Sequence, residues 1–251
     1  MQNKKFWNFT QSENISSLYL YGEIASETWY GDEVTPLEFA KELNECSGDL
    51  NVYIFSPGGD VFAGFAIYTM LNRYEGHVNV FIDGLAASAA SVVAMAGDNI
   101  YIPENATMMI HNAWGVIAGN KFEVEDFRNQ LELIDEQISQ VYAARTGKDI
   151  EEIKQLMNAE TWMNGSEAVN LGFATALTEN KKIAAKIDLS VFDSYKHAPD
   201  KGAFLMPDVA EEHSEPLADM KPEINDGGSA LVEQRKMFNE TKKKMYEVIS
   251  K

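Results

Sequence analysis

A serine stands among the smallest side chains of the sequence, in the stretch FIDGLAASAASVVAMAG at residues 81–97. Ser88 follows an apolar run typical of a strand and opens an Ala-rich run typical of a helix. We therefore expect it at the carboxyl end of a strand, where parallel sheets present their sites. The neighbouring alanines let another chain approach the hydroxyl, which makes Ser88 a candidate nucleophile. A helix cap or a packing serine would give the same local pattern, and Ser91 competes for the role from one turn further along.

A nucleophilic serine needs a general base, and the sequence contains four histidines. His197 and His213 lie in an acidic, Pro-punctuated stretch, and His77 precedes a strand beside a turn, where a surface position is expected. His111 ends the apolar run TMMI. If that strand is parallel to the strand before Ser88, the imidazole lies on the same rim as the hydroxyl, and His111 becomes the candidate base.

Acyl transfer also needs hydrogen-bond donors for an oxyanion, and the segment FSPGGD at residues 55–60 offers them. Its two glycines leave a bare backbone whose N–H groups can point at a substrate oxygen. A tight strand-to-helix turn or a phosphate-binding loop would also use glycines here. The phosphate alternative is the weaker one, because the Lys and Ser/Thr of a P-loop do not follow.

The elements around these residues alternate between strand and helix. Strands are expected in SLYLYGEI, LNVYIFS, VNVFID, NIYI and TMMIHN, and helices in TPLEFAKELNEC, VFAGFAIYTMLNRY and AASVVAMAG. Thr35 and Asp60 are the expected N-caps of the first two helices. This alternation predicts βαβ units, a mainly parallel sheet and an α/β fold.

A long helix is expected over residues 122–145, with an apolar seam that alternates steps of three and four. The seam consists of Val124, Phe127, Leu131, Ile134, Ile138 and Val141. Its regularity and length suit packing against another subunit, although a seam that faces the chain's own core would have the same period.

The order and spacing of the three candidate segments resemble those of the Clp peptidase family (ClpP). SPGG comes first, G-x-A-A-S follows about thirty residues later, and MMIHNAWG comes about twenty residues beyond. The segment at residues 146–177, TGKDIEEIKQLMNAETWMNGSEAVNLGFATAL, is also similar to the closing part of that family. The resemblance covers about residues 18–177.

The resemblance implies a role for each matching residue. Ser88 would attack the scissile carbonyl, His111 would take and return the proton, and Glu160 would orient His111 where the family usually has Asp. The backbone N–H groups of Gly59 and Ala89 would form the oxyanion hole. The family uses neither a cofactor nor a metal in this role.

The resemblance also implies an architecture and an assembly. The fold would be a ClpP/crotonase-like spiral of ββα units. It would comprise a short leading segment at 1–17, a peptidase domain at 18–177, and an acidic, partly flexible C-terminal extension at 178–251. Residues 115–145 are similar to the handle, a strand plus a long helix that joins two rings. Stacked heptameric rings would enclose the active sites and admit unfolded proteins or peptides.

Two departures from the family pattern indicate a subclass. The short leading segment argues against coupling to an ATP-driven unfoldase, and the extension is similar to that of phage- and prophage-type relatives. Processing of capsid or scaffold proteins is the role implied by that likeness. The alternatives are a catalytically weak capsid-assembly protein of the same fold and an acyl-CoA enzyme of the crotonase superfamily.

The composition limits the classes of binding partner and the cellular compartment that we expect. With 39 acidic and 21 basic residues the formal charge is −18, which disfavours nucleic acid and anionic membranes as partners. Cys46 is the only cysteine, so no intramolecular disulfide can form. No secretory signal or spanning segment is evident. We expect a cytoplasmic protein, in the bacterial host cytoplasm if it is phage-encoded.

Overall fold

The computed structural model describes residues 6–12, 15–25, 36–179 and 195–198. The chain divides into two compact units, residues 1–188 and 189–251. Only residues 195–198 of the second unit are described, as irregular chain in which His197 is exposed. Thr35, His213 and most of the expected extension at 178–251 therefore lie outside the described residues, and the fold below is that of the first unit.

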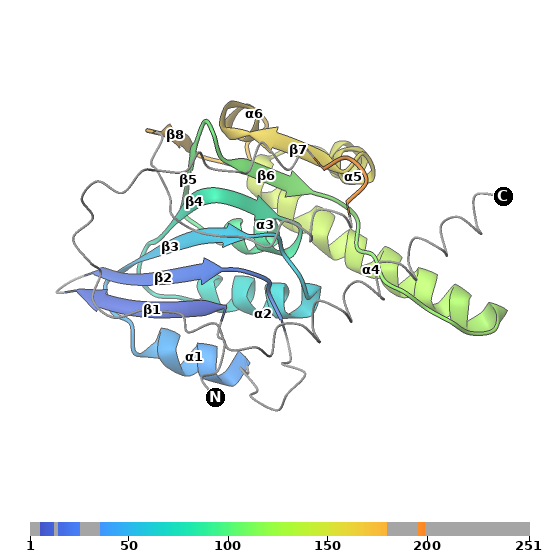
Figure 1. Ribbon diagram of the computed structural model, residues 1–251, viewed down its shortest axis with the longest axis horizontal. Helices are drawn as coiled ribbons and strands as arrows, with labels where there is room; N and C mark the ends of the chain where they lie inside the picture. The colour runs from blue at the N-terminus through green and yellow to red at the C-terminus, as the bar shows by residue number, and fades with distance from the viewer. Residues whose placement is uncertain (1–5, 13–14, 26–35, 180–194, 199–251) are drawn as a thin grey trace, which may run out of the picture. The chain divides into compact units, whose positions relative to one another are not determined.

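A sheet of eight strands organises the described part of the first unit (Figure 1). The strands are β1 (Trp7–Ser12), β2 (Ile15–Tyr21), β3 (Asp49–Ser56), β4 (Val78–Ala87), β5 (Asn99–Pro103), β6 (Thr107–Ile110), β7 (Thr161–Asn164) and β8 (Ala176–Thr178). They lie in the order β1-β2-β3-β4-β5-β8, while β6 pairs with β4 and β7. Only β1–β2 and β6–β7 are antiparallel among the described pairs. The predicted α/β class with a mainly parallel sheet is confirmed.

Six helices accompany these strands in the described ranges. They are α1 (Pro36–Asn44), α2 (Val61–Asn72), α3 (Ala89–Ala94), α4 (Lys121–Thr146), α5 (Ile150–Asn158) and α6 (Gly165–Asn170). Asp60 caps α2 as predicted, since its carboxylate accepts a hydrogen bond from the Ala63 N–H at 2.8 Å. The long helix expected at 122–145 is α4.

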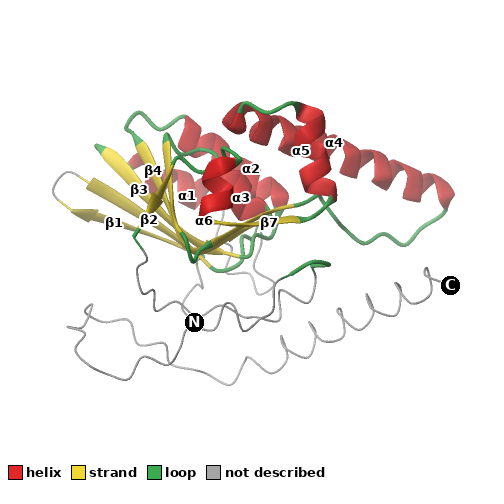
Figure 2. Cartoon of the chain, turned by 90° about the horizontal axis from the view of Figure 1, so that it is seen from above, coloured by secondary structure: helices red, strands yellow, loops and turns green. Residues whose placement is uncertain are grey.

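The core lies between one face of the sheet and the helices packed on it. Along β3, Leu50, Val52 and Ile54 are fully buried, while the residues between them are half-buried on the opposite face. This alternation follows from the period of two in a strand. Figure 2 shows α2 and α3 on one side of the strands, which is the side that receives these buried side chains.

Strand β4 bends on its way to Ser88. Its first half pairs with β5 and its last three residues pair with β6, so one strand serves two neighbours. The pairing with β3 shifts between Ile54 and Ser56, and Gly84 adopts φ +109°, a left-handed conformation that favours glycine. The bend carries the end of β4 beyond β5 and sets it beside β6, which leads to His111.

Two elements differ from the sequence-based expectation. The predicted first strand is preceded by another, β1, whose residues Trp7 and Phe9 pack on Phe39 of α1. The alternation of Trp and Phe in WNFTQS was a readable strand signal. The other difference is in the handle, where we expected a strand before the long helix. Residues 111–120 contain no strand in the described chain and reach α4 as irregular backbone.

Candidate active site

Ser88 and His111 meet at the carboxyl ends of two parallel strands. Ser88 follows β4 and His111 follows β6, and these strands pair in register from Leu85↔Thr107 to Ala87↔Met109. The His111 Nε2 atom lies 2.7 Å from the Ser88 Oγ, within hydrogen-bond distance. The structure therefore brings together the two residues that the sequence analysis paired, for the reason it gave: parallel strands end on one rim.

The backbone at Ser88 is unusual. Ser88 occupies the N-cap of α3 with φ +55° and ψ −127°, and only Ser88 and Glu160 have a positive φ among the described non-glycine residues. A side chain in this region is strained, and such strain persists only where surrounding contacts impose it. One of those contacts joins the Ser88 N–H to the Met109 carbonyl oxygen at 2.9 Å. The Ser88 N–H is therefore bound to the neighbouring strand although it lies at the start of a helix.

The glycine loop after β3 lies directly against the serine turn. A Cβ atom built on Gly58 would lie 2.7 Å from the Ser88 Cβ and 2.9 Å from the Ala89 N. Any side chain at Gly58 would therefore clash with the serine turn, so the bare backbone is required there. Gly59 has φ +144°, and the carbonyl and amide that flank it pair with Ile24. The predicted oxyanion donors, Gly59 and Ala89, thus belong to two segments in close approach.

Glu160 joins the site through the pairing of β6 with β7. These strands are antiparallel in the register Thr107↔Asn164 to Ile110↔Thr161. His111 directly follows β6 and Glu160 directly precedes β7, so the last pair of this register, Ile110↔Thr161, brings both residues to the same end of the paired strands. Glu160 is 9% exposed, and its Oε1 accepts a hydrogen bond from the Trp162 Nε1 at 3.3 Å. A buried carboxylate that accepts a hydrogen bond from an indole thus lies at the same strand end as His111.

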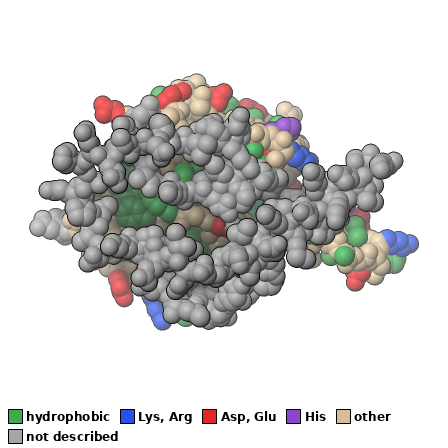
Figure 3. Space-filling model, in the orientation of Figure 1, with side chains coloured by type: hydrophobic (Ala, Val, Ile, Leu, Met, Phe, Trp, Pro, Cys, Tyr) green, Lys and Arg blue, Asp and Glu red, His purple; other side chains and the backbone are tan. Residues whose placement is uncertain are grey.

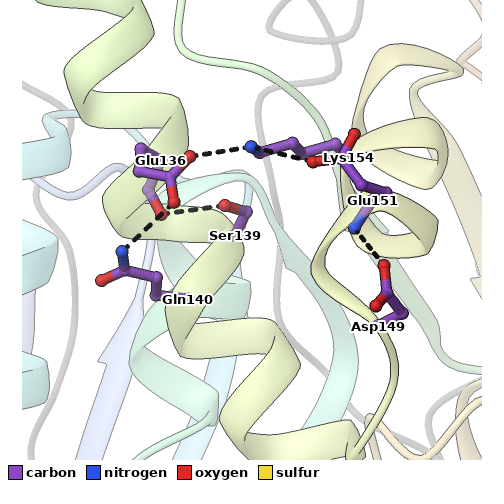
Figure 4. Close-up of polar contacts among 6 residues, drawn as sticks. All are labelled: Glu136, Ser139, Gln140, Asp149, Glu151 and Lys154. Carbon is purple, nitrogen blue, oxygen red and sulfur yellow. Dashed lines mark hydrogen bonds and ion pairs between the residues drawn. The ribbon is translucent and has the colours of Figure 1, made fainter.

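Helix α5 ends two residues before Glu160 and is fixed to α4 by charged groups (Figure 4). The Lys154 ammonium lies 2.8 Å from a carboxylate oxygen of Glu136 on α4 and 3.3 Å from one of Glu151. All three side chains are partly exposed, so these ion pairs contribute little to stability. They show that α5 lies against α4 at this point. The contacts tie α5 to α4, and the chain that leaves α5 passes through Glu160 into β7.

Two further polar contacts hold the chain that follows His111. The Asn112 Nδ2 donates to the Asn158 Oδ1 at 2.7 Å, which ties this chain to the end of α5. The Ala113 N–H donates to an Asp135 carboxylate oxygen on α4 at 2.6 Å. Partial burial raises the pKa of Asp135, while the Ala113 N–H acts in the opposite direction. The chain directly after His111 is thus fixed to both α5 and α4.

Sequence reasoning missed several of these residues. Trp162 stands two residues after Glu160, which is the same-face spacing of a strand, but nothing in the sequence marks its indole as a donor. Gly58 was noticed only as part of a glycine pair. The contacts of Asn112 and Asp135 join segments 22 to 46 residues apart and leave no local signal.

The other candidates lie elsewhere. His77 is exposed and sits 3.5 Å from Asp98, which agrees with the surface position predicted for it. Ser91, the rival nucleophile, is fully buried, and its hydroxyl contacts the Ser88 carbonyl and Tyr142.

Within the described ranges, no three His, Cys, Asp or Glu side chains are grouped as a metal site would require. None of the described helices combines the length and the apolar character needed to cross a membrane.

Comparisons with known proteins point to one family. The model of the family described as Clp protease matches residues 10–181. The ATP-dependent Clp protease proteolytic subunit of Ligilactobacillus salivarius (strain UCC118) is 35% identical over 143 residues, which are 56% of this chain and 73% of that protein. The ATP-dependent Clp protease proteolytic subunit 2 of Treponema denticola is 29% identical over 171 residues, 67% of this chain and 84% of that protein. Ser88, His111 and Glu160 all lie inside the matched range.

Proposed function

The chain belongs to the Clp protease family, and from that membership we propose that it is a serine endopeptidase that cleaves unfolded proteins or peptides. The observation that carries the proposal is the 2.7 Å contact between the Ser88 Oγ and the His111 Nε2. Family membership supports peptide-bond hydrolysis as the reaction, and the contact supports serine as the nucleophile.

The first half of the reaction forms an acyl-enzyme. The Ser88 Oγ attacks the scissile carbonyl carbon while the His111 Nε2 takes its proton. The tetrahedral intermediate then collapses, the C–N bond breaks, and His111 returns the proton to the leaving amine. In the second half a water molecule loses a proton to His111 and attacks the ester carbon, the C–O bond to Ser88 breaks, and His111 gives the proton to the Ser88 Oγ as the acid is released.

The negative charge that develops on the carbonyl oxygen needs fixed donors. The amides of Gly59 and Ala89 are our candidates, because the close approach of the glycine loop to the serine turn brings both segments beside the Ser88 side chain. Backbone donors of this kind act without reorganising, and loss of one costs on the order of 10²–10³-fold in rate.

Glu160 is the proposed third member of the site. Its carboxylate would accept the Nδ1–H of His111, which selects the tautomer with a free Nε2 and stabilises the imidazolium. The pairing of β6 with β7 supports this assignment because it brings both residues to one end of these strands, and the Trp162 indole donates a hydrogen bond to the carboxylate. These contacts support the view that Glu replaces the usual Asp here.

We also propose that the chain self-associates into rings through its handle, as the family resemblance implies. Figure 1 shows α4 extending past the sheet, and Figure 3 shows apolar side chains among charged ones on its projecting end. Large apolar residues are exposed on this end of α4 and on the chain that leads into it: Trp114, Val116, Ile117, Phe122, Val124 and Leu133. Apolar residues gathered on one segment mark interaction surfaces. Stacked heptamers and a capsid or scaffold protein as the substrate remain predictions from the resemblance.

The proposal is tested with a serine-directed probe and an unfolded substrate. We expect a fluorophosphonate to label Ser88 in the full-length protein, as located by mass spectrometry of its peptides. Ser88→Ala should remove both the labelling and the cleavage of an unfolded protein such as reduced casein, while native mass spectrometry finds the same assembly.

Ser166→Ala is the matched control, because Ser166 lies on α6 and hydrogen-bonds Glu104 rather than any residue of the site. It should leave labelling and cleavage unchanged. Full cleavage by Ser88→Ala would refute the serine mechanism. A wild-type protein that assembles but is neither labelled nor active would favour an assembly role over catalysis, and turnover of an acyl-CoA without labelling would favour the crotonase alternative.

A further inference from the structure

A buried pair of hydroxyls lies behind the proposed nucleophile and is not used by the mechanism above. The Ser91 Oγ is 2.6 Å from the Ser88 carbonyl oxygen and 2.8 Å from the Tyr142 Oη. Ser91 is fully buried in α3, and Tyr142 is 1% exposed in α4. The contact therefore joins the turn that carries Ser88 to the long helix, across 51 residues of sequence.

The direction of these hydrogen bonds follows from counting protons. A hydroxyl has one proton to donate, and a carbonyl oxygen can only accept. The Ser91 hydroxyl donates to the Ser88 carbonyl, so the Tyr142 phenol must be the donor in its contact with Ser91. Burial raises the pKa of Tyr142, which keeps the phenol protonated and able to donate.

The carbonyl that receives this hydrogen bond shares a rigid plane with a proposed oxyanion donor. The peptide unit between residues 88 and 89 contains the Ser88 C=O and the Ala89 N–H, which point in opposite directions because the unit is planar and trans. Fixing the carbonyl therefore fixes the amide. The Ser91 N–H also donates to this carbonyl at 2.9 Å, and the Val92 N–H lies at 3.4 Å. All three donors hold the carbonyl toward α3, which turns the Ala89 N–H away from the helix.

The orientation of this peptide needs support from outside the turn. Ser88 has φ +55°, a strained conformation for a residue with a side chain. A strained backbone relaxes unless surrounding contacts hold it, and here the side-chain contact comes from Ser91, backed by the Tyr142 phenol. Tyr142 is itself fixed, since its ring packs edge-on against Phe173 with centroids 5.5 Å apart.

We propose that Ser91 and Tyr142 are positioning residues that orient the Ala89 amide as an oxyanion donor through the Ser88 carbonyl. This inference rests on the serine mechanism proposed above and adds two residues to it. Neither side chain touches the substrate. Their effect should therefore appear in the stabilisation of the transition state and not in the binding of the substrate.

The test compares Ser91→Ala, Tyr142→Phe and the double variant in the full-length assembled protein. We expect Ser91→Ala to lower kcat on the order of tenfold or more with KM unchanged, which is less than the loss of an oxyanion donor itself. Tyr142→Phe should cause a smaller loss, since Ser91 keeps its own proton for the carbonyl. The double variant should match Ser91→Ala, because Tyr142 acts only through Ser91.

A second readout follows the oxyanion directly. A peptide boronate forms a tetrahedral adduct with the serine, so its inhibition constant should rise in proportion to the fall in kcat. A merely structural role would alter thermal stability without this parallel change. Ser91→Ala leaves the buried Tyr142 hydroxyl without its acceptor and can fail to fold. The double variant contains no buried hydroxyl that lacks an acceptor, so it can be measured even if Ser91→Ala does not fold.

Several outcomes would overturn the inference while the serine mechanism stands. They are an unchanged kcat in Ser91→Ala, a rise in KM in place of a fall in kcat, and a double variant whose loss equals the product of the single losses. An inactive wild-type protein, or an active Ser88→Ala variant, would instead refute the serine mechanism.

Discussion

The two halves of α4 have the same hydrophobic period but different surroundings. Toward the C-terminal end, Ile138 is 5% exposed and Tyr142 is buried behind the serine turn. Toward the N-terminal end, Phe122 and Val124 are exposed, and Leu133 is 61% exposed. One continuous helix thus supports the proposed site at one end and presents uncovered apolar side chains at the other.

The difference shows what hydrophobic periodicity can and cannot say. A seam of apolar residues predicts that a helix face will be covered, but not whether its own chain or another chain covers it. Ile138 and Val124 belong to the same predicted seam, and only the first is covered here. We therefore propose that the packed half supports the chemistry and the projecting half the assembly, and each can be disturbed alone.

The largest expected effect is a loss of activity at the packed end of α4, where the attached helix α5 leads to Glu160. Glu160→Gln keeps the size of the side chain but cannot stabilise the imidazolium, so kcat should fall on the order of 10⁴-fold. Glu160→Asp keeps the carboxylate and should lose far less. Steady-state kinetics on a fluorogenic peptide would measure both. Equal activity of Glu160→Gln and the wild type would remove Glu160 from the mechanism, and native mass spectrometry should find both variants assembled as the wild type.

The next effect compares two aliphatic residues on the same helix. Ile138→Ala opens a cavity in the core and should lower the free energy of unfolding by about 2–5 kcal/mol. Leu133→Ala should change the unfolding of the isolated protomer by less than about 0.5 kcal/mol, because its side chain is exposed. Urea unfolding at low protein concentration measures both. Similar losses at the two positions would contradict the division of the helix.

The projecting half should respond through assembly. Leu133→Asp places a charge on the uncovered apolar surface and should weaken self-association by at least about tenfold, or about 1.4 kcal/mol. Dilution followed by native mass spectrometry or sedimentation measures the change. Asp126→Ala, at an exposed position of the same helix, removes a charge without removing an apolar side chain and is the matched control. Unchanged association in Leu133→Asp would place the interface elsewhere.

The smallest effect concerns Asp135, which lies on α4 between the two halves. Its pKa is raised in the fold, chiefly by partial burial, so the folded state favours the protonated carboxyl. Stability should therefore fall as the pH rises from the ordinary pKa of 3.8 through the folded-state value, and it should stay level beyond that. Asp135→Asn can still accept the Ala113 N–H and should lose this pH dependence. Parallel unfolding curves of the two proteins across pH 3–7 would contradict the assignment.

Much of the fold and part of the site could be predicted because the signals are local. Strands such as VNVFID and TMMI are short apolar runs, and Asp60 is a cap beside the helix it begins. The pairing of Ser88 with His111 followed from one topological rule, that parallel strands end on one rim. The strand β1 was also readable but was overlooked, while Thr35 lies outside the described residues.

What the sequence by itself determined is the set of elements and the identity of the two groups at the strand ends, since both depend on neighbours along the chain. The tertiary structure alone decided the positive φ of Ser88, the close approach of Gly58, the β6–β7 pairing that brings Glu160 to the strand end of His111, and the Tyr142 hydroxyl behind Ser91. Each depends on contacts between distant segments, and the free energy of such contacts comes from burial and hydrogen bonding that no local pattern records. For the same reason, only the tertiary structure shows that one half of α4 is covered by the chain and the other half is exposed.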